Sequence, residues 1–263
     1  MTIAPNLTEI VFTAGAGHTL VGVTTSDDYP PAVDSLPRFG ALPLDFEALA
    51  ALNPDLVLAN DNINSPRDAE TFDALGIPIY YFSFQRLDDI LRGIRTTGTL
   101  LHTGPYADAA ADSIEIALDA LRRRTEALAN RPLTLFLIGD ETLYSFGPES
   151  YIHDVITMAG GRSATADIET LRPVLSDEFV LTKKPDVIFG TFGTDYDPAR
   201  LLALHPTWDI VPAVQNGRIY SLDPDVFLRP TPRLLRAIQD MARLLHPTLF
   251  PPSEEPVAPA ETP

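Results

Sequence analysis

Cysteine is absent from this 263-residue sequence, and its absence excludes several kinds of chemistry at once. Disulfide bonds, thiolate catalysis, zinc fingers and iron–sulfur clusters all need cysteine side chains. Because a chain without cysteine suits an oxidising and a reducing compartment equally, the absence does not locate the protein. Lysine is scarce as well, since the 19 basic residues comprise Lys183, Lys184 and 17 arginines.

Positive charge is in short supply overall. The 36 acidic residues outnumber the 19 basic ones and leave a formal net charge of −17 at pH 7. A protein that binds nucleic acid presents a basic face to the phosphates. The composition therefore argues against nucleic acid as a partner and favours solubility or a cationic partner.

Long apolar runs are missing, although 45% of the residues are hydrophobic. A membrane-spanning helix needs about 20 consecutive apolar residues, and no such run occurs. The first nine residues contain neither a basic segment nor an apolar one, so as written they carry no secretory signal peptide. We therefore expect a chain that does not span the membrane.

Short apolar runs alternate with amphipathic stretches, a pattern that predicts an α/β fold with parallel sheets. Strands are expected at 20–24, 56–59, 79–82, 133–138, 187–189 and 219–222. Helices are expected near 8–14, 46–52, 69–75, 87–101, 150–159, 177–181, 198–204 and 231–245.

One further helix is expected to be unusually long. Residues 106–130 contain neither glycine nor proline, and apolar side chains recur along them at helical spacing. About 25 helical residues span roughly 38 Å, which is longer than one small domain needs. The length favours a helix that joins two lobes, and an ordinary long surface helix is the alternative.

A repeated segment lies on either side of this helix. Residues 44–58 match residues 175–189, because in both a glutamate precedes Pro-Asp by seven residues and an apolar strand follows. Equal spacing of helix, proline and strand predicts two lobes of like construction. We divide the chain into an N-terminal lobe (1–104), a connecting helix (105–131), a C-terminal lobe (132–246) and a tail rich in proline and glutamate (247–263), expected to be disordered.

Signatures of enzymes and of nucleotide or metal sites are missing. The segment Gly15-Ala16-Gly17 follows a helix and has Leu20 where a dinucleotide motif needs its third glycine, so it indicates a helix end. The five histidines show no short metal-ligand spacing. No nucleophile elbow, Walker loop or His-Glu-x-x-His motif occurs. We expect no catalytic residues, no metal site and no cofactor.

Polar and aromatic side chains follow several of the predicted strands. They lie at 26–31, 60–62 and 80–82 in the first half and at Tyr144, Phe192 and Tyr196 in the second. The carboxyl ends of parallel strands are where α/β proteins bind ligands. The pattern favours a large, flat ligand with a polar rim, while packing within loops is the alternative for each residue.

Several ordered motifs together are similar to those of one known family. They are Ala4-Pro5-Asn6-Leu7-Thr8-Glu9-Ile10, Gly22-Val23, Asp28-Tyr29-Pro30-Pro31, the run 49–58, Met158-Ala159-Gly160-Gly161, Trp208, the run 214–220 and Arg229-Pro230-Thr231-Pro232-Arg233-Leu234. The sequence resembles the solute-binding proteins of cobalamin and iron–siderophore ABC importers, the helical-backbone group of periplasmic binding proteins. The resemblance covers nearly the whole chain up to His246.

The resemblance implies two α/β lobes with parallel central sheets, joined by a single long backbone helix, with a ligand cleft between the lobes. Such proteins close only slightly, catalyse nothing and dock on a permease. The implied function is capture of a corrinoid or a ferric chelate, such as cobalamin, haem or a ferric siderophore, by a monomer.

The resemblance also implies which residues line the cleft. Tyr29, Tyr81, Tyr144 and Arg229 take cleft positions, while Asn60 and Arg172 stand where cobalamin-binding members often have tryptophan. Loss of indole surface weakens packing on a corrin, and two arginines favour an anionic ligand. Cobalamin is the ligand slightly favoured by the resemblance, before an anionic iron chelate. For Arg229 the alternative is a structural role as an anchor at the start of the last helix.

Docking on the permease is implied to use one acidic residue from each lobe. Glu178 matches the second-lobe position. The first-lobe position falls near Pro66, so Asp68 or Glu70 would substitute there, whereas Glu47 is the repeat partner of Glu178 and does not match.

The location is left with two alternatives. Family members carry a signal or lipoprotein peptide and a fuller first strand, and here Met1-Thr2-Ile3 stand in that place. The resemblance therefore implies an extracytoplasmic protein whose start has been trimmed or misassigned. The rivals are a cytoplasmic binding or sensing protein on the same fold and an enzyme that has reused the fold.

Overall fold

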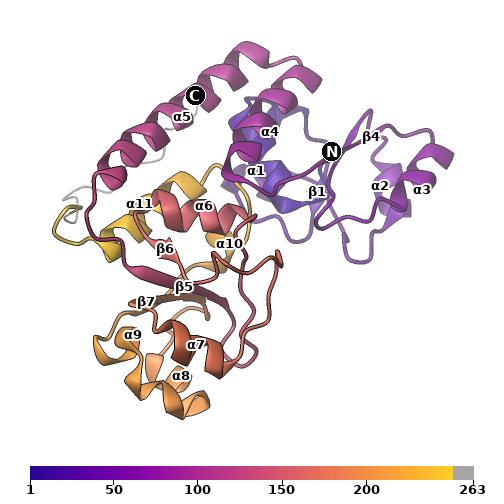
Figure 1. Ribbon diagram of the computed structural model, residues 1–263. Helices are drawn as coiled ribbons and strands as arrows, with labels where there is room; N and C mark the ends of the chain where they lie inside the picture. Colours follow the sequence, from indigo (N-terminus) through magenta and orange to yellow (C-terminus); the bar gives the residue numbers. More distant parts are fainter. Residues whose placement is uncertain (251–263) are drawn as a thin grey trace.

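The computed structural model describes residues 1–250 and shows two α/β lobes joined by one long helix, α5 (Gly104–Glu126) (Figure 1). The predicted fold class is confirmed. None of the helices in the described residues is both long and apolar enough to cross a membrane.

The N-terminal lobe contains two small parallel sheets. Strand β1 (Val23–Thr24) pairs with β2 (Arg38–Phe39), and β3 (Val57–Asn60) pairs with β4 (Ile79–Phe82). The first residues extend the second sheet, because the Ile3 amide donates to the Leu58 carbonyl at 3.0 Å. The helices of this lobe are α1 (Pro5–Thr13), α2 (Phe46–Ala51), α3 (Asp68–Ala74) and α4 (Leu87–Leu100), with short 3-10 turns at Gly17–Thr19 and Pro31–Ser35.

The C-terminal lobe is built on one parallel sheet in the order β6-β5-β7-β8. Its strands are β5 (Leu133–Ile138), β6 (Arg162–Ser163), β7 (Val187–Thr191) and β8 (Ile219–Ser221). Its helices are α6 (Tyr151–Met158), α7 (Asp177–Lys183), α8 (Pro198–Leu204), α9 (Pro212–Gln215), α10 (Pro224–Phe227) and α11 (Leu234–Leu245), with a 3-10 turn at Pro206–Ile210.

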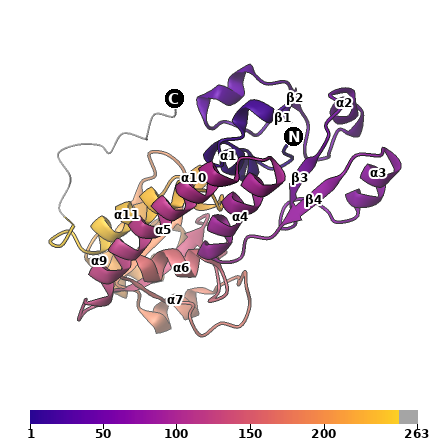
Figure 2. The same cartoon turned by 90° about the horizontal axis from the view of Figure 1, so that it is seen from above.

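The long helix holds the lobes together by packing on helices of both. Figure 2 shows α5 beside α4 and across α11, and it also contacts α6. Gly98 of α4 allows α4 and α5 to approach closely, because a Cβ atom built at this glycine would lie 2.3 Å from the Ala107 Cβ of α5. The helix begins at Gly104, two residues before the predicted start, because proline is well suited to the first turn.

One hydrophobic core runs through both lobes. It includes Leu7 of α1, Ile94 of α4, Leu118 of α5, Val155 of α6 and Ile238 of α11. Separate smaller cores lie under the outer part of each lobe. Because the junction is filled with buried apolar side chains rather than a polar linker, free hinge motion is disfavoured.

The repeated segments fold alike down to their capping residues. Asp45 and Ser176, at matching positions, each accept a hydrogen bond from the backbone N–H three residues later, and so cap α2 and α7. Asn53 and Lys184, also at matching positions, end the two helices with positive φ values of 47° and 51°. A strand follows in both copies, as predicted.

The end of the described chain packs on the long helix. Phe250 is buried, the Arg124 guanidinium lies 4.1 Å from the centre of its ring, and Arg124 donates to the Leu249 carbonyl at 2.9 Å. Packed structure therefore continues past His246, where the tail was predicted to begin. Residues 251–263 of that predicted tail lie outside the described residues.

The left-handed conformation of Lys184 gives a first prediction. We expect Lys184→Gly to raise the free energy of unfolding by about 0.5–1 kcal/mol, because glycine has no Cβ to be strained at positive φ. Lys184→Ala is the matched control, since it removes the same charge but keeps the Cβ. Urea unfolding of the three proteins measures the difference, and equal stability of the Gly and Ala variants would contradict the prediction.

Candidate functional site

A buried ion pair joins the two lobes at their junction. Arg233, next to α11 of the C-terminal lobe, donates from Nε and Nη2 to the two carboxylate oxygens of Glu9 in α1, at 2.8 and 2.5 Å. The Glu9 side chain is only 3% exposed. The Tyr29 ring lies against the same arginine, 4.5 Å from the guanidinium carbon. Tyr29 therefore lies at the contact between the lobes.

Burial and charge act in opposite directions on this pair. Burial raises the pKa of Glu9, and the hydrogen bonds and charge of Arg233 only partly offset it. Burial works against the charge on Arg233, but Glu9 outweighs it and raises the pKa of that guanidinium. Each member of the pair therefore offsets part of the cost of burying the charge of the other.

Arg229 makes a second, more exposed link between the lobes. Its Nη1 donates to Asp28 of the N-terminal lobe at 2.5 Å, and its Nη2 lies 2.7 Å from Asp225 of α10. The predicted cleft residues Tyr29 and Arg229 thus lie in one cluster with the arginine–glutamate pair. Two carboxylates already neutralise Arg229, so an anionic ligand would have to displace one of them.

The facing part of the C-terminal lobe is made by two paired loop segments. Leu175 N–H donates to the Leu143 carbonyl and Ser145 N–H donates to the Pro173 carbonyl, both at 2.9 Å. This pairing places Tyr144 opposite Val174, and the two side chains are 49% and 61% exposed. Figure 1 shows the loops between β5 and α7 on the side of this lobe that lies toward the N-terminal lobe.

Arg172 belongs to the same surface. It lines an open hollow of about 470 Å³ together with Val174 and Phe179. Its side chain is exposed, and within residues 1–250 its guanidinium has no hydrogen-bonded or ion-paired partner. Behind it Tyr151 is buried and donates to the Phe227 carbonyl at 3.2 Å. Burial raises the pKa of Tyr151, while the nearby positive charge of Arg172 acts to lower it. Arg172 is therefore an unpaired charge available to a ligand.

The predicted first-lobe residues differ in how accessible they are. Asn60 is 1% exposed, and its side chain donates to Asn6 Oδ1 at 3.3 Å and accepts from the Asn62 N–H at 3.0 Å. Its amide is thus used inside the lobe. Tyr81 is half-buried and donates to the Ser65 carbonyl at 3.0 Å, and burial followed by the charge of Asp68 raises its pKa.

The three predicted docking acids lie in the first turns of short helices. Glu178 is exposed at the start of α7, beside Asp177, whose carboxylate is held by the Trp208 indole N–H at 2.9 Å. Asp68 and Glu70 lie in the first turn of α3. Asp177 is therefore bound internally, whereas Glu178 faces solvent.

Sequence reasoning missed the partners of the residues that it found. Glu9, Asp28 and Arg233 stand within the quoted motifs, but no role was assigned to them, because their pairing joins positions about 200 residues apart. Val174 was missed because nothing in its local pattern distinguishes it from a core valine. Within residues 1–250 no group of three or more metal-ligating side chains comes together.

Comparison with known proteins identifies the family. A family model described as periplasmic binding protein matches residues 2–226. The chain belongs to this family. That match covers the N-terminal lobe, the connecting helix and most of the C-terminal lobe, up to α10.

Two curated relatives match over almost the whole chain. The vitamin B12-binding protein of Vibrio cholerae is 30% identical over 248 residues, which cover 93% of this chain and 88% of the relative. An uncharacterized ABC transporter substrate-binding lipoprotein of Bacillus subtilis, YvrC, is 25% identical over 256 residues, covering 95% of this chain and 80% of that protein.

Solved structures of similar proteins share the fold. The periplasmic vitamin B12-binding protein of Vibrio cholerae superposes with a TM-score of 0.79 at 29% identity, covering 93% of this chain and 94% of that one. A periplasmic haem-binding protein of Roseiflexus superposes with a TM-score of 0.81 at 27% identity, covering 94% and 97%. The predicted relation to substrate-binding proteins of ABC transporters is confirmed, and these relatives are binding proteins rather than enzymes.

The junction pair gives the second prediction. We expect Glu9→Ala to lower the free energy of unfolding by about 3 kcal/mol or more, because it leaves a partly buried arginine without its counter-ion. Glu115→Ala is the matched control, since Glu115 pairs with Arg95 at 2.8 Å on the exposed surface and should cost under about 0.5 kcal/mol. Denaturant unfolding measures both, and similar losses would contradict a structural role for the junction pair.

Proposed function

We propose that this protein is the solute-binding component of an ABC importer that captures a flat metal chelate, a corrinoid or a ferric chelate, between its lobes. The observation that carries the proposal is the surface formed by Tyr144, Arg172 and Val174. An exposed aromatic ring, an exposed aliphatic side chain and an unpaired guanidinium lie together on one pair of loops. Such a set suits a flat apolar body with a polar rim.

The state of the arginines narrows the ligand class. Arg229 is occupied by Asp28 and Asp225, so Arg172 is the arginine ready to receive a carboxylate or another anionic group. The single tryptophan, Trp208, is fully buried and offers no indole to a corrin. Both features favour chelates with anionic side groups, such as haem or a carboxylate siderophore, and leave cobalamin and its relatives as the second class. The metal would arrive as part of the cargo, and the protein itself needs no cofactor.

The same proposal assigns the protein a location and a mode of action. A monomer outside the cytoplasmic membrane would take up the chelate and present it to the permease through Glu178 and either Asp68 or Glu70. The names of the relatives, which include a lipoprotein and periplasmic proteins, support this location. The continuous core of the junction supports small closure on binding. Capture without turnover follows, so no enzymatic activity is assigned.

Ligand titration tests the proposal directly. We expect purified protein to bind one of cobalamin, cobinamide, haem or a ferric siderophore, with a change in the absorbance of the chelate. Tyr144→Ala should weaken that binding by about tenfold, because it removes a stacking surface worth roughly 1–2 kcal/mol. Arg172→Gln should weaken binding of an anionic chelate more than that of a neutral one.

The matched control is Tyr106→Ala. Tyr106 is 47% exposed, almost as Tyr144 is, but it lies on α5 away from the Tyr144 loops. Binding should be unchanged in this variant. Absence of binding to all four chelates by folded protein, or equal losses in the two tyrosine variants, would overturn the proposed ligand site.

Docking is tested in cells of the source organism. We expect a chromosomal Glu178→Gln change to lower uptake of the chelate that binds in the titration, while the affinity of the purified variant is unchanged. The reason is that loss of an exposed carboxylate weakens an ion pair with the permease, while Glu178 does not line the hollow beside Arg172. Glu47→Gln, at the matching position of the repeat, is the control and should transport normally. Equal uptake by the two strains would contradict the assigned docking role.

A further inference from the structure

A second hollow lies on the α5 side of the lobe junction. It has a volume of about 410 Å³ and is lined by α4 of the N-terminal lobe, α5, α6 of the C-terminal lobe and the segment that leads into β5. This volume is within the range of small-molecule sites. Neither Tyr144 nor Arg172 lines it, so it is separate from the proposed chelate site.

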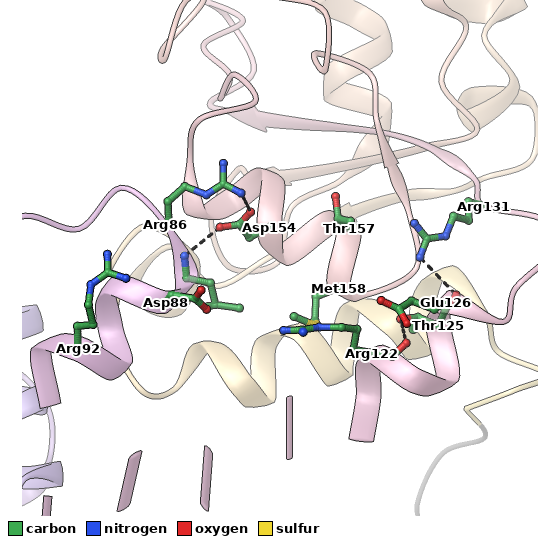
Figure 3. A pocket seen from close by; sticks show the side chains of 11 residues that line it. Arg86, Asp88, Arg92, Arg122, Thr125, Glu126, Arg131, Asp154, Thr157 and Met158 are labelled. Atoms are coloured by element: carbon green, nitrogen blue, oxygen red, sulfur yellow. Dashed lines mark hydrogen bonds and ion pairs between the residues drawn. The ribbon is translucent and has the colours of Figure 1, made fainter. Parts of the chain in front are cut away.

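Four arginines border this hollow, which we call the arginine pocket: Arg86, Arg92, Arg122 and Arg131. Figure 3 shows Arg86 and Arg92 at one end, Arg131 at the other and Arg122 between them beneath Met158. The chain carries a net charge of −17. Four of its 17 arginines nevertheless lie together in this one place. The lining has four arginines against three acidic residues, so it is slightly positive whereas the chain as a whole is strongly negative.

The guanidinium groups of the pocket have donors to spare. Each carries five N–H donors. Arg131 uses one on the Thr125 carbonyl at 3.4 Å, and Arg122 lies 3.4 Å from Asp119. Arg92 pairs with Asp89, which also caps the start of α4. The remaining donors match the oxygen atoms of phosphate or carboxylate groups in pairs.

The acids of the pocket set what kind of anion can bind. Asp154 is already engaged, because it accepts from Arg86 at 2.5 Å and from the Leu87 N–H at 3.0 Å. Asp88 and Glu126 also line the pocket and oppose an incoming negative charge. A monovalent anion therefore gains little, whereas a multivalent anion that engages several guanidinium groups at once gains most.

The geometry points to a second binding site, in the arginine pocket, for a small multivalent oxyanion such as pyrophosphate or a tricarboxylate. Arg92 on α4 belongs to one lobe and Arg131 leads into the other, with Arg122 on the helix between them. The oxyanion would bridge the lobes on the side of α5. If the oxyanion binds one angle between the lobes more tightly than another, it stabilises that angle by the same free energy.

Calorimetric titration with pyrophosphate and, separately, with citrate tests this site at ionic strength held constant with sodium chloride. We expect one of them to bind with a stoichiometry of one. Arg122→Gln should weaken that binding about tenfold or more, and Arg92→Gln should do the same. Binding of pyrophosphate alone would assign the site to phosphates, and binding of citrate alone would assign it to polycarboxylates.

Arg123→Gln is the matched control. Arg123 is the exposed neighbour of Arg122 on α5 and does not line the pocket, so the variant loses the same charge and should bind like the original protein. Circular dichroism of each variant shows whether α5 is intact. Absence of binding to both anions at millimolar concentration, or an equal loss in the Arg122 and Arg123 variants, would overturn the inference.

Discussion

The ion pair between Glu9 and Arg233 is the contact on which the arrangement of the lobes depends. A glutamate that is 3% exposed remains charged only beside a matching cation, and that cation comes from the other lobe. The pair lies next to a core that continues from α1 through α4, α5 and α6 to α11. Separation of the lobes here would expose apolar surface and break the ion pair. The junction is therefore a fixed support rather than a hinge.

A fixed junction limits where a ligand can be recognised. Arg229 and Tyr29 lie against the support, and their polar or aromatic groups are already in contact with Asp28 and Arg233. The loops that carry Tyr144 and Arg172 are anchored by backbone pairing and by the buried side chains of Leu143 and Leu175, while Tyr144 and Arg172 stay exposed. Recognition can then vary by change of loop residues while the support stays the same.

The sequence predicted helices and strands well where a local hydrophobic pattern marks them. Strands 79–82 and 133–138 and helix 198–204 match their predicted bounds, because each is an apolar or amphipathic run with clear ends. The two-residue strands β2 and β6 carry no such run and could not be seen. Asn60 took a cleft position by resemblance, yet the structure buries its amide, since burial depends on the packing of α1 against β3. Pairing of residues about 200 positions apart likewise has no local pattern.

The abundance of arginine and the scarcity of lysine have a structural use at the lobe junction. Three carboxylates are paired there with arginines of the opposite lobe: Glu9 with Arg233, Asp28 with Arg229, and Asp154 with Arg86. Arg233 engages both oxygens of Glu9 through its planar fork, so this carboxylate is held in orientation as well as in distance, which an ammonium group does not achieve, whereas the other two pairs each use one N–H. The apolar core makes the lobes adhere, but apolar contacts alone tolerate sliding. The bidentate pair of Arg233 with Glu9 therefore favours one angle between the two lobes, and with it one shape of the space between them.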